Sequence, residues 1–252
     1  MTIKIIPNKQ IFLFDIDGTL TEPRVRATIE FEKKFIKWAK KNNVVLVTGS
    51  DFEKVKEQLS QELLNNMIYI FCCMGNELRL YDGRTVYSKN FNLTPSLEED
   101  LKIFLKRSPF PYRTSNHIEK RPGMVNFSIV GREATVFQRK EYNEWDKINK
   151  ERKSIANFIN SKYPNLEASI GGSISIDIIP TGNDKSQVIE FLNNYLYSGE
   201  IQSIVFFGDR TEPGGNDYGI VKKAFECKNI KYHTVSGPRD TLDILKNKYF
   251  SP

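Results

Sequence analysis

The segment IFLFDIDGT, residues 11–19, constrains the fold of this chain more than any other feature. Its four apolar residues from Ile11 to Phe14 are typical of a strand buried on both faces of a parallel sheet. Asp15 and Asp17 follow that strand directly, two residues apart. Because ligands bind at the carboxyl ends of strands in open α/β sheets, the segment predicts a polar site at this edge of a sheet.

Strand and helix patterns alternate near both ends of the chain. The elements expected after the first strand are a helix over 28–40, a strand over 44–47, a helix over 51–64, a strand over 67–71, and later a helix over 185–197, a strand over 203–207, a helix over 218–227 and a strand over 230–235. Such alternation indicates a parallel sheet with helices on its faces. We therefore predict an α/β fold with a Rossmann-like, doubly wound core formed by residues 1–83 and 184–252.

The middle of the chain follows a different pattern. It combines alternating strands at 124–130 and 173–179 with helices near 96–106 and 141–163. The turns at 81–84 and 180–183 contain the Gly, Asp and Asn residues expected where the chain crosses between domains. We predict an inserted α+β cap over residues 84–183, hinged at these turns, with a ligand-binding cleft between cap and core.

The composition narrows the class of protein. With 39% hydrophobic and 27% charged residues, the chain resembles an ordinary globular protein. No apolar run approaches the roughly 20 residues of a membrane span, and residues 1–10 lack the features of a signal peptide, so we expect a cytoplasmic protein without a membrane partner. The net charge of +6 is compatible with a nucleic-acid partner or with small phosphorylated substrates, and since Lys and Arg alternate with Asp and Glu along most of the chain, charge alone does not choose between them. Cys72, Cys73 and Cys227 are expected to be reduced thiols.

The paired aspartates suit phosphoryl transfer through an enzyme-bound intermediate. That chemistry needs a nucleophile, a proton shuttle and a cation that neutralises the phosphate oxygens. Asp15 would attack phosphorus while Asp17 handles the proton. Since the ligands on offer are oxygens, the expected cation is Mg²⁺.

Further candidate residues follow other predicted strands. Asp209 comes after the strand at 203–207, and Asn216 and Asp217 lie beyond a glycine turn, so these three could add ligands to the metal site. Lys185 could hold a phosphate group by its charge, while Thr48 or Ser50 could donate hydrogen bonds from their hydroxyl groups. The predicted catalytic set is Asp15, Asp17 and Lys185, and the predicted metal set is Asp15, Asp17, Asp209, Asn216 and Asp217.

Other readings of these residues are weaker. A calcium loop beginning at Asp15 would place Leu20 where an EF-hand needs glycine and Arg26 where it needs glutamate. Asp15 and Asp17 could simply form a turn, although the strand before them and the later acidic segment disfavour this. A nucleic-acid binder remains a third alternative, but no recognisable nucleic-acid module is present.

Four segments in order resemble the motifs of the haloacid dehalogenase superfamily: DIDGT at 15–19, VTGS at 47–50, GNDK at 182–185 and GDRTEPGGND at 208–217. Across nearly the whole chain, a further set is similar to the eukaryotic-type phosphomannomutases: DGTLTEPR at 17–24, GSDFEKVKEQL at 49–59, RPGMVN at 121–126, VGR at 130–132, SIGGSISIDIIP at 169–180 and GDRTEPGGND at 208–217. This resemblance implies that the chain interconverts mannose 6-phosphate and mannose 1-phosphate for GDP-mannose synthesis.

The resemblance also implies residue roles. Asp15 would be the nucleophile and Asp17 the general acid and base, with Mg²⁺ held by Asp15, the Asp17 carbonyl and Asp209. The residues implied to bind substrate are Arg24, Arg121, Arg132 and Arg139 for phosphate, and Ser175 and Asp177 for sugar hydroxyls. The family further implies activation by a hexose 1,6-bisphosphate and a homodimer formed through the cap.

Two segments depart from the family pattern. FCCMGNEL, residues 71–78, lies where these mutases have a proline-glutamate-asparagine-glycine turn, which could alter the hinge or the cleft wall. Thr48 stands where they have glycine, a feature that resembles hydrolytic members of the superfamily. A magnesium-dependent sugar-phosphate phosphatase is therefore the alternative function.

Overall fold

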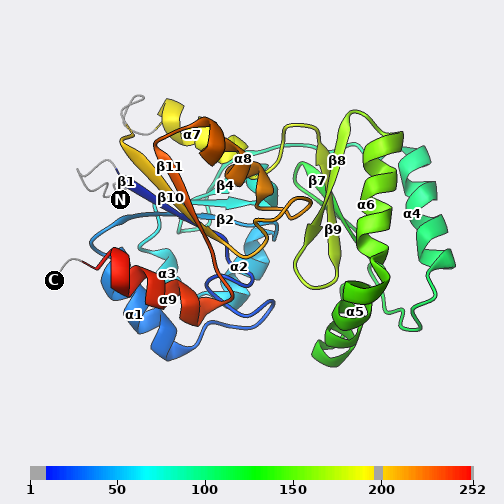
Figure 1. Ribbon diagram of the computed structural model, residues 1–252, viewed down its shortest axis with the longest axis horizontal. Helices are drawn as coiled ribbons and strands as arrows, with labels where there is room; N and C mark the ends of the chain where they lie inside the picture. The colour runs from blue at the N-terminus through cyan, green and yellow to red at the C-terminus, as the bar shows by residue number, and fades with distance from the viewer. Residues whose placement is uncertain (1–9, 196–200, 251–252) are drawn as a thin grey trace.

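A computed structural model describes residues 10–195 and 201–250, and it contains two sheets (Figure 1). The first has the order β11-β10-β1-β2-β3-β4-β5, where the strands are β1 (Gln10–Phe14), β2 (Asn43–Val47), β3 (Tyr69–Cys72), β4 (Glu77–Arg79), β5 (Thr85–Ser88), β10 (Ser203–Gly208) and β11 (Ile230–Thr234). The five strands from β11 to β3 are parallel to one another. Strand β4 pairs antiparallel with β3, and β5 pairs antiparallel with β4. This confirms the predicted α/β core.

Helices cover both faces of the seven-stranded sheet (Figure 1). Phe12 and Phe14 of β1 belong to the core beneath α1 (Ile29–Ala39) and α9 (Pro238–Lys248). Ile11 and Leu13 belong to the opposite core beneath α7 (Gln187–Tyr195) and α8 (Tyr218–Glu226). Alternate side chains on a strand point to opposite faces, so a strand covered twice must be apolar at every position.

The second sheet has the antiparallel order β6-β7-β9-β8 and lies to the side of the first. Its strands are β6 (Ile118–Arg121), β7 (Met124–Ser128), β8 (Leu166–Gly171) and β9 (Ser175–Pro180), and its helices are α4 (Pro95–Arg107), α5 (Val136–Asn149) and α6 (Glu151–Lys162). The helices cover one face, where Phe127, Ile176 and Ile178 are buried. The alternate residues Ser175 and Asp177 therefore lie on the other face, toward the seven-stranded sheet.

Two long helices expected from the sequence are each divided. The segment 51–64 forms α2 (Phe52–Gln58) and α3 (Gln61–Leu64), because Leu59 is extended and Ser60 caps the second helix by accepting a hydrogen bond from Leu63 N. The helix expected over 141–163 instead begins at Val136 and breaks at Lys150, whose φ is 57°. Apolar spacing continues through such breaks, so periodicity does not reveal them.

The first expected hinge is misplaced. The turn at 81–84 connects β4 to β5, and both strands belong to the seven-stranded sheet. The chain therefore passes to the second sheet only after Ser88, since α4 begins at Pro95. The Gly and Asp residues of this turn suit a hairpin between two strands of one sheet as well as a crossing between domains. The division of the chain into core and cap domains otherwise stays a prediction.

At the other end of the predicted cap, β9 ends at Pro180 and α7 begins at Gln187, two residues later than expected. The last two residues predicted for this helix lie outside the described part of the chain, as do residues 1–9, on which the absence of a signal peptide was judged. Across residues 10–195 and 201–250, none of the helices has the length and hydropathy of a membrane span.

Candidate active site

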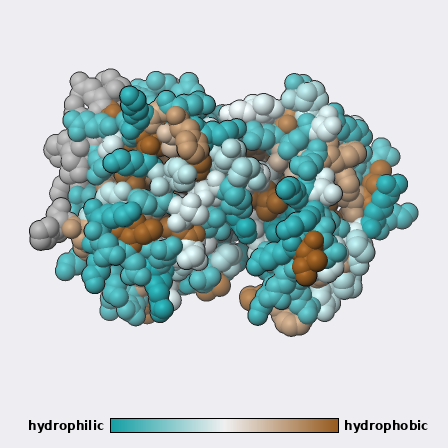
Figure 2. All heavy atoms as spheres, viewed as in Figure 1, coloured by the Kyte–Doolittle hydropathy of each residue, from teal (hydrophilic) through white to brown (hydrophobic). Residues whose placement is uncertain are grey.

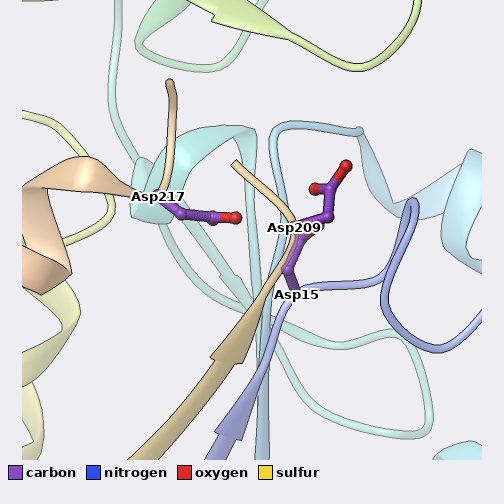
Figure 3. Close-up of side chains that lie close together, drawn as sticks. All are labelled: Asp15, Asp209 and Asp217. Carbon is purple, nitrogen blue, oxygen red and sulfur yellow. The ribbon is translucent and has the colours of Figure 1, made fainter. Parts of the chain in front are cut away.

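Asp15 and Asp209 lie at the carboxyl ends of neighbouring strands. The parallel pairing of β1 with β10 aligns Phe14 with Phe207, so the first residues after both strands meet at one edge. Asp217 precedes α8, and its side chain points toward the other two (Figure 3). One oxygen from each carboxylate lies within 4.8 Å of the others. The fold thus gathers three acidic groups that are up to about two hundred residues apart.

Lys185 lies beneath this acidic cluster. Its side chain is fully buried, and Nζ lies 2.6 Å from Asp15 Oδ1 and 2.7 Å from Asp217 Oδ1. Burial alone would lower the pKa of Lys185, but the two carboxylates raise it above its usual value. The ammonium group therefore remains charged and holds Asp15 in place. It does so from behind, because Lys185 does not line the pocket.

Lys185 pairs with two of the three carboxylates, Asp15 and Asp217, while Asp209 lies 3.5 Å from Arg210 Nε. Burial raises the pKa of Asp15 well above its usual value, with Lys185 opposing the shift and Asp217 and Asp209 adding to it. Burial and the charge of Asp217 likewise raise the pKa of Asp209 to about 7. A divalent cation would compensate this excess of negative charge, and an oxygen-only donor set suits a hard cation. The cluster fits a metal ion.

Asp17 is oriented away from the acidic cluster. Its Oδ1 accepts hydrogen bonds from Arg24 N at 2.8 Å and from Gln58 Nε2 at 2.9 Å, and its Oδ2 accepts one from Ser50 Oγ at 3.3 Å. The carboxylate is not part of the three-residue cluster, which agrees with a metal role for its carbonyl rather than its side chain. Gln58 lies in the segment 49–59 that resembles the family, but no role for it followed from the sequence, because its partner Asp17 is 41 residues away.

Gly18 explains why the nucleophile loop contains glycine. Its φ is +79°, and a Cβ atom there would lie 2.5 Å from Asp209 Oδ2. Any larger residue would be strained in this conformation and would displace the Asp209 carboxylate. The glycine of DIDGT is therefore required for the close approach of the two strand ends.

One pocket brings together most of the predicted site residues. It is lined by twelve of them: Asp15, Asp17, Arg24, Thr48, Ser50, Arg121, Arg132, Arg139, Ser175, Asp177, Asp209 and Asn216. The other two, Lys185 and Asp217, are completely buried behind it. These residues come from two bodies, the seven-stranded sheet with its loops and helices and the second sheet with its own. The surface shows a notch between the two bodies at the lower edge of the view (Figure 2). The pocket therefore joins the predicted core and cap.

Direct contacts hold the two bodies together around the pocket. Arg121 of β6 donates from NH1 to the Gly49 carbonyl at 2.7 Å, and Lys54 of α2 lies 2.8 Å from Glu119 of β6. The backbone N–H of Ile170 in β8 donates to the Gly214 carbonyl at 2.9 Å. These contacts hold the two bodies together so that substrate-binding candidates of one line the same pocket as Asp15 and Asp209 of the other.

Four arginines give the pocket a positive wall. Arg132 donates to Ser175 Oγ at 2.6 Å, and Arg139 donates from Nε to the Ala134 carbonyl at 2.8 Å. Burial and the nearby charge of Arg24 lower the pKa of Arg139 to about 10, and burial also lowers the pKa of Arg24. The Nη2 atom of Arg24 is buried without a hydrogen-bond partner among the described residues. Mutually repelling guanidinium groups with unused donors fit an anionic ligand.

Glu119 is a second residue that the sequence reasoning missed. Its Oε2 forms an ion pair with both Arg121 and Arg132, while its Oε1 contacts Lys54. It therefore aligns two phosphate-binding candidates before any ligand arrives. Its position two residues before Arg121 on an alternating strand could have placed it on the same face.

The unusual segment FCCMGNEL supports the pocket from behind. Its 3₁₀ turn η1 (Cys73–Gly75) is buried, and neither Cys73 nor Met74 lines the pocket. Cys73 N donates to the Ser50 carbonyl and Met74 N to the Thr48 carbonyl, both at 2.9 Å. The segment that departs from the family pattern therefore stabilises the Thr48–Ser50 loop through two backbone hydrogen bonds. The Thr48 hydroxyl accepts a hydrogen bond from Ser50 N at 3.1 Å and shapes the same loop.

Comparisons with solved structures agree with this fold. Solved structures with similar folds include an IMP-nucleotidase from Plasmodium falciparum (TM-score 0.59, 17% identity, 94% of this chain and 66% of that one) and a Thermoplasma acidophilum protein (TM-score 0.55, 17% identity, 94% and 97%). A sucrose-phosphatase from Synechocystis also matches (TM-score 0.52, 12% identity, 95% and 97%). At these identities they establish the fold alone.

Sequence relatives are more specific. Proteins named phosphomannomutase match from Spinacia oleracea (37% identity, 92% of each chain), Triticum aestivum (35%, 95% of each chain) and Dictyostelium discoideum (33%, 98% of this chain and 99% of the relative). The profile of the eukaryotic phosphomannomutase family matches residues 31–251. Taken with the site described above, these matches show that this chain belongs to the eukaryotic phosphomannomutase family.

Proposed function

We propose that this protein is a phosphomannomutase that interconverts mannose 6-phosphate and mannose 1-phosphate through a phosphorylated Asp15. The observation that carries the proposal is the shared pocket, in which Asp15 faces arginines contributed by both bodies. A nucleophile at one end and a separate cationic wall can hold both ends of a sugar bisphosphate. Relatives named phosphomannomutase, which match over more than nine-tenths of their length, support the same activity.

In the proposed reaction, Asp15 carries a phosphoryl group and passes it to a free hydroxyl of the sugar phosphate. Asp17 takes the proton from that hydroxyl, so the sugar oxygen forms its bond to phosphorus as the Asp15–phosphorus bond breaks. The hexose bisphosphate then turns around, and Asp15 accepts its other phosphoryl group while Asp17 returns the proton to the leaving oxygen. Mg²⁺, bound by Asp15, Asp209 and the Asp17 carbonyl, would neutralise charge on the transferring phosphoryl group.

The arrangement of Asp17 suits this proton transfer. Two donors fix its Oδ1, and the hydroxyl of Ser50 approaches its Oδ2 at 3.3 Å, so the carboxylate is oriented but not locked in an ion pair. Lys185 steadies Asp15 through Oδ1. Arg121, Arg132 and Arg139 would bind the phosphate that is not being transferred, and Ser175 and Asp177 the sugar hydroxyls. In this proposal, Thr48 and Ser50 shape the phosphate-binding loop.

A coupled assay tests the proposal against hydrolysis. Mannose 6-phosphate and glucose 6-phosphate are supplied with and without hexose 1,6-bisphosphate, and both the 1-phosphate isomer and free phosphate are measured. We expect isomer to accumulate, faster with the bisphosphate, and phosphate release to remain slow because closure around the pocket excludes water. Release of phosphate without isomer would show a sugar-phosphate phosphatase instead.

The metal site yields a stability prediction. Without Mg²⁺, the pKa of Asp209 near 7 means that the folded protein binds a proton more tightly than the unfolded chain, so stability falls as pH rises from about 4 to 7. Asp209→Asn removes this penalty and should melt at a higher temperature than the parent at pH 8 in Mg²⁺-free buffer. Adding Mg²⁺ at about 100 times its Kd should stabilise the parent by about 2.7 kcal/mol and Asp209→Asn far less.

Differential scanning calorimetry checks both parts of this prediction. Asp243→Asn, an exposed position on α9, is the matched control and should respond to Mg²⁺ as the parent does. An Asp209→Asn protein with the parent's full response to Mg²⁺ would remove Asp209 from the metal site.

The cationic wall yields a further prediction. Arg139→Gln should lower kcat/KM for mannose 6-phosphate by about 10- to 100-fold, because charge-assisted hydrogen bonds to phosphate are each worth about 1.5–3 kcal/mol. Arg139→Lys should recover little, since an ammonium group lacks the fork of a guanidinium. Steady-state kinetics measures the loss, with Arg107→Gln on the exposed end of α4 as control. Unchanged kinetics in Arg139→Gln would exclude a role in phosphate binding.

We also propose the remaining properties implied by the family. These are activation by a hexose 1,6-bisphosphate, a cytoplasmic location, a role in GDP-mannose synthesis, and a homodimer formed through the cap. The dimer has support on the surface of α5, where Val136, Phe137 and Ile148 are 77%, 63% and 82% exposed. Light scattering of the purified protein measures the oligomeric state, and a monomer at micromolar concentration would exclude the dimer.

A further inference from the structure

Asn126 occupies the centre of the pocket-facing side of the second sheet. It lies on β7 directly opposite Asp177 of β9, as Cα partners in the antiparallel register. The side chain is 2% exposed and lines the same pocket as Asp15 and the arginines. Asn126 ends the RPGMVN segment that resembles the family, but the resemblance implied no role for it.

The hydrogen bonds of Asn126 determine which way its amide group points. Its Nδ2 lies 2.6 Å from Asp177 Oδ1, and a carboxylate oxygen needs a donor, so the nitrogen must face Asp177. The amide oxygen Oδ1 therefore faces elsewhere, and it is buried without a hydrogen-bond partner among the described residues. Buried polar atoms are nearly always paired, which makes an unpaired acceptor beside a binding pocket informative.

A second asparagine that contacts Asp177 also has an unpaired amide oxygen. Asn216, on the loop that carries Asp209 and Asp217, donates from Nδ2 to Asp177 Oδ2 at 3.3 Å, and its own Oδ1 is also buried and unpaired within the described residues. Gly49 and Gly171 leave room for the same carboxylate, since a Cβ at either would lie 2.9 Å or 2.2 Å from Asp177 Oδ2. Asp177 is therefore held in one orientation.

Unpaired acceptors in a pocket of this kind match a ligand with several hydroxyl donors. Phosphate oxygens only accept hydrogen bonds, so they would not satisfy Asn126 Oδ1, whereas a sugar hydroxyl can donate to it. We propose that Asn126 binds a ring hydroxyl of the hexose phosphate and, together with Asp177, determines which sugars are accepted. This inference rests on the proposed function and names one more residue for it. A site built to bind a hydroxyl discriminates strongly against sugars that lack it.

The test compares variants across a set of deoxy sugars. Asn126→Leu removes the amide, and Asn126→Ser keeps a small polar side chain in case the leucine variant folds poorly. Each is assayed with mannose 6-phosphate and with its 2-deoxy, 3-deoxy and 4-deoxy derivatives. We expect both variants to lose roughly 5- to 30-fold in kcat/KM on mannose 6-phosphate, and less than about 2-fold on the one derivative that lacks the bound hydroxyl.

A control substitution, and a repeat of Asn126→Ser in a protein that also carries Asp177→Asn, complete the test. Ser128→Ala changes a buried side chain two residues along β7 that does not line the pocket, and it should keep the parent's discrimination among the four sugars. Equal losses of the Asn126 variants on all four sugars, or no loss, would overturn the inference. So would the absence of any further effect of Asn126→Ser in an Asp177→Asn background, because Asn126 would then act only by orienting Asp177.

Equilibrium binding separates this inference from the proposed function. Calorimetric titration of the same four sugars into the parent and variants measures hydroxyl recognition without turnover. If the parent binds mannose 6-phosphate but forms no isomer, the mutase proposal fails while the titration still decides the role of Asn126. If the parent forms isomer and the Asn126 variants bind every derivative as the parent does, only the inference fails.

Discussion

Asp15→Asn is expected to abolish turnover of sugar phosphates, with a loss in kcat of at least about a thousandfold, as for other covalent nucleophiles. An amide is a poor nucleophile, so the variant could not form the phosphorylated intermediate. The fold should survive, since burial, together with the charges of Asp217 and Asp209, raises the pKa of Asp15 and disfavours its charged form. Kinetics and melting temperature together distinguish a chemical loss from unfolding.

Direct detection of the intermediate strengthens this experiment. Acid-quenched parent protein, mixed with a hexose 1,6-bisphosphate, should gain the mass of one phosphoryl group on the peptide that contains Asp15, and Asp15→Asn should gain none. Asp243→Asn on the exposed face of α9 is the control for the loss of one carboxylate. A variant at position 15 that turned over sugar phosphates at the parent rate would eliminate the proposed mechanism.

Lys185→Met is expected to cost about 3–5 kcal/mol of the free energy of unfolding in Mg²⁺-free buffer, besides inactivating the protein. The ammonium group is fully buried and is the direct ion-pair partner of both Asp15 and Asp217. Its removal leaves Asp15 and Asp217 without this ion-pair partner. Denaturant unfolding measures the effect, with Lys106→Met at an exposed site of α4 expected to change stability by less than about 0.5 kcal/mol.

A double-mutant cycle identifies the cause. If Lys185→Met destabilises through uncompensated charge, adding Asp217→Asn should recover part of the loss, and Mg²⁺ should stabilise Lys185→Met more than it stabilises the parent. Additive effects of the two substitutions would instead show that Lys185 stabilises the core through packing of its methylene groups. In that case, a group other than Lys185 would have to neutralise the negative charge of Asp15.

The candidate site was only partly visible in the sequence. Asp15 and Asp209 could be placed together because each follows an apolar strand of a predicted parallel sheet, and parallel strands end at the same edge. Lys185 was predicted to hold phosphate, yet the structure buries it behind Asp15 and Asp217, outside the pocket lining. Which side chain faces a ligand depends on helix placement, which sequence spacing does not fix.

Gln58, Glu119 and Asn126 show the same limit. Gln58 and Asn126 each contact a predicted residue that lies far away in the chain or across a strand pairing that the sequence does not specify. Glu119 lies two residues before Arg121, but its contacts with Arg132 and Lys54 also depend on the tertiary structure. The sequence alone does not show which residue a polar side chain on a strand or helix will contact. The breaks at Ser60 and Lys150, and the extension of the core sheet by β5, were missed for a related reason, because local backbone changes leave the apolar pattern intact.

The sequence by itself determined the doubly covered parallel core, the presence of a second α+β sheet and the acidic residues at the strand ends, because buried strands impose a continuous apolar pattern and motifs sit at fixed offsets from it. Only the tertiary structure decided which groups pair across the pocket. Hydrogen bonds and ion pairs act over about 3–4 Å and depend on the relative placement of the two sheets, a quantity that no local pattern encodes.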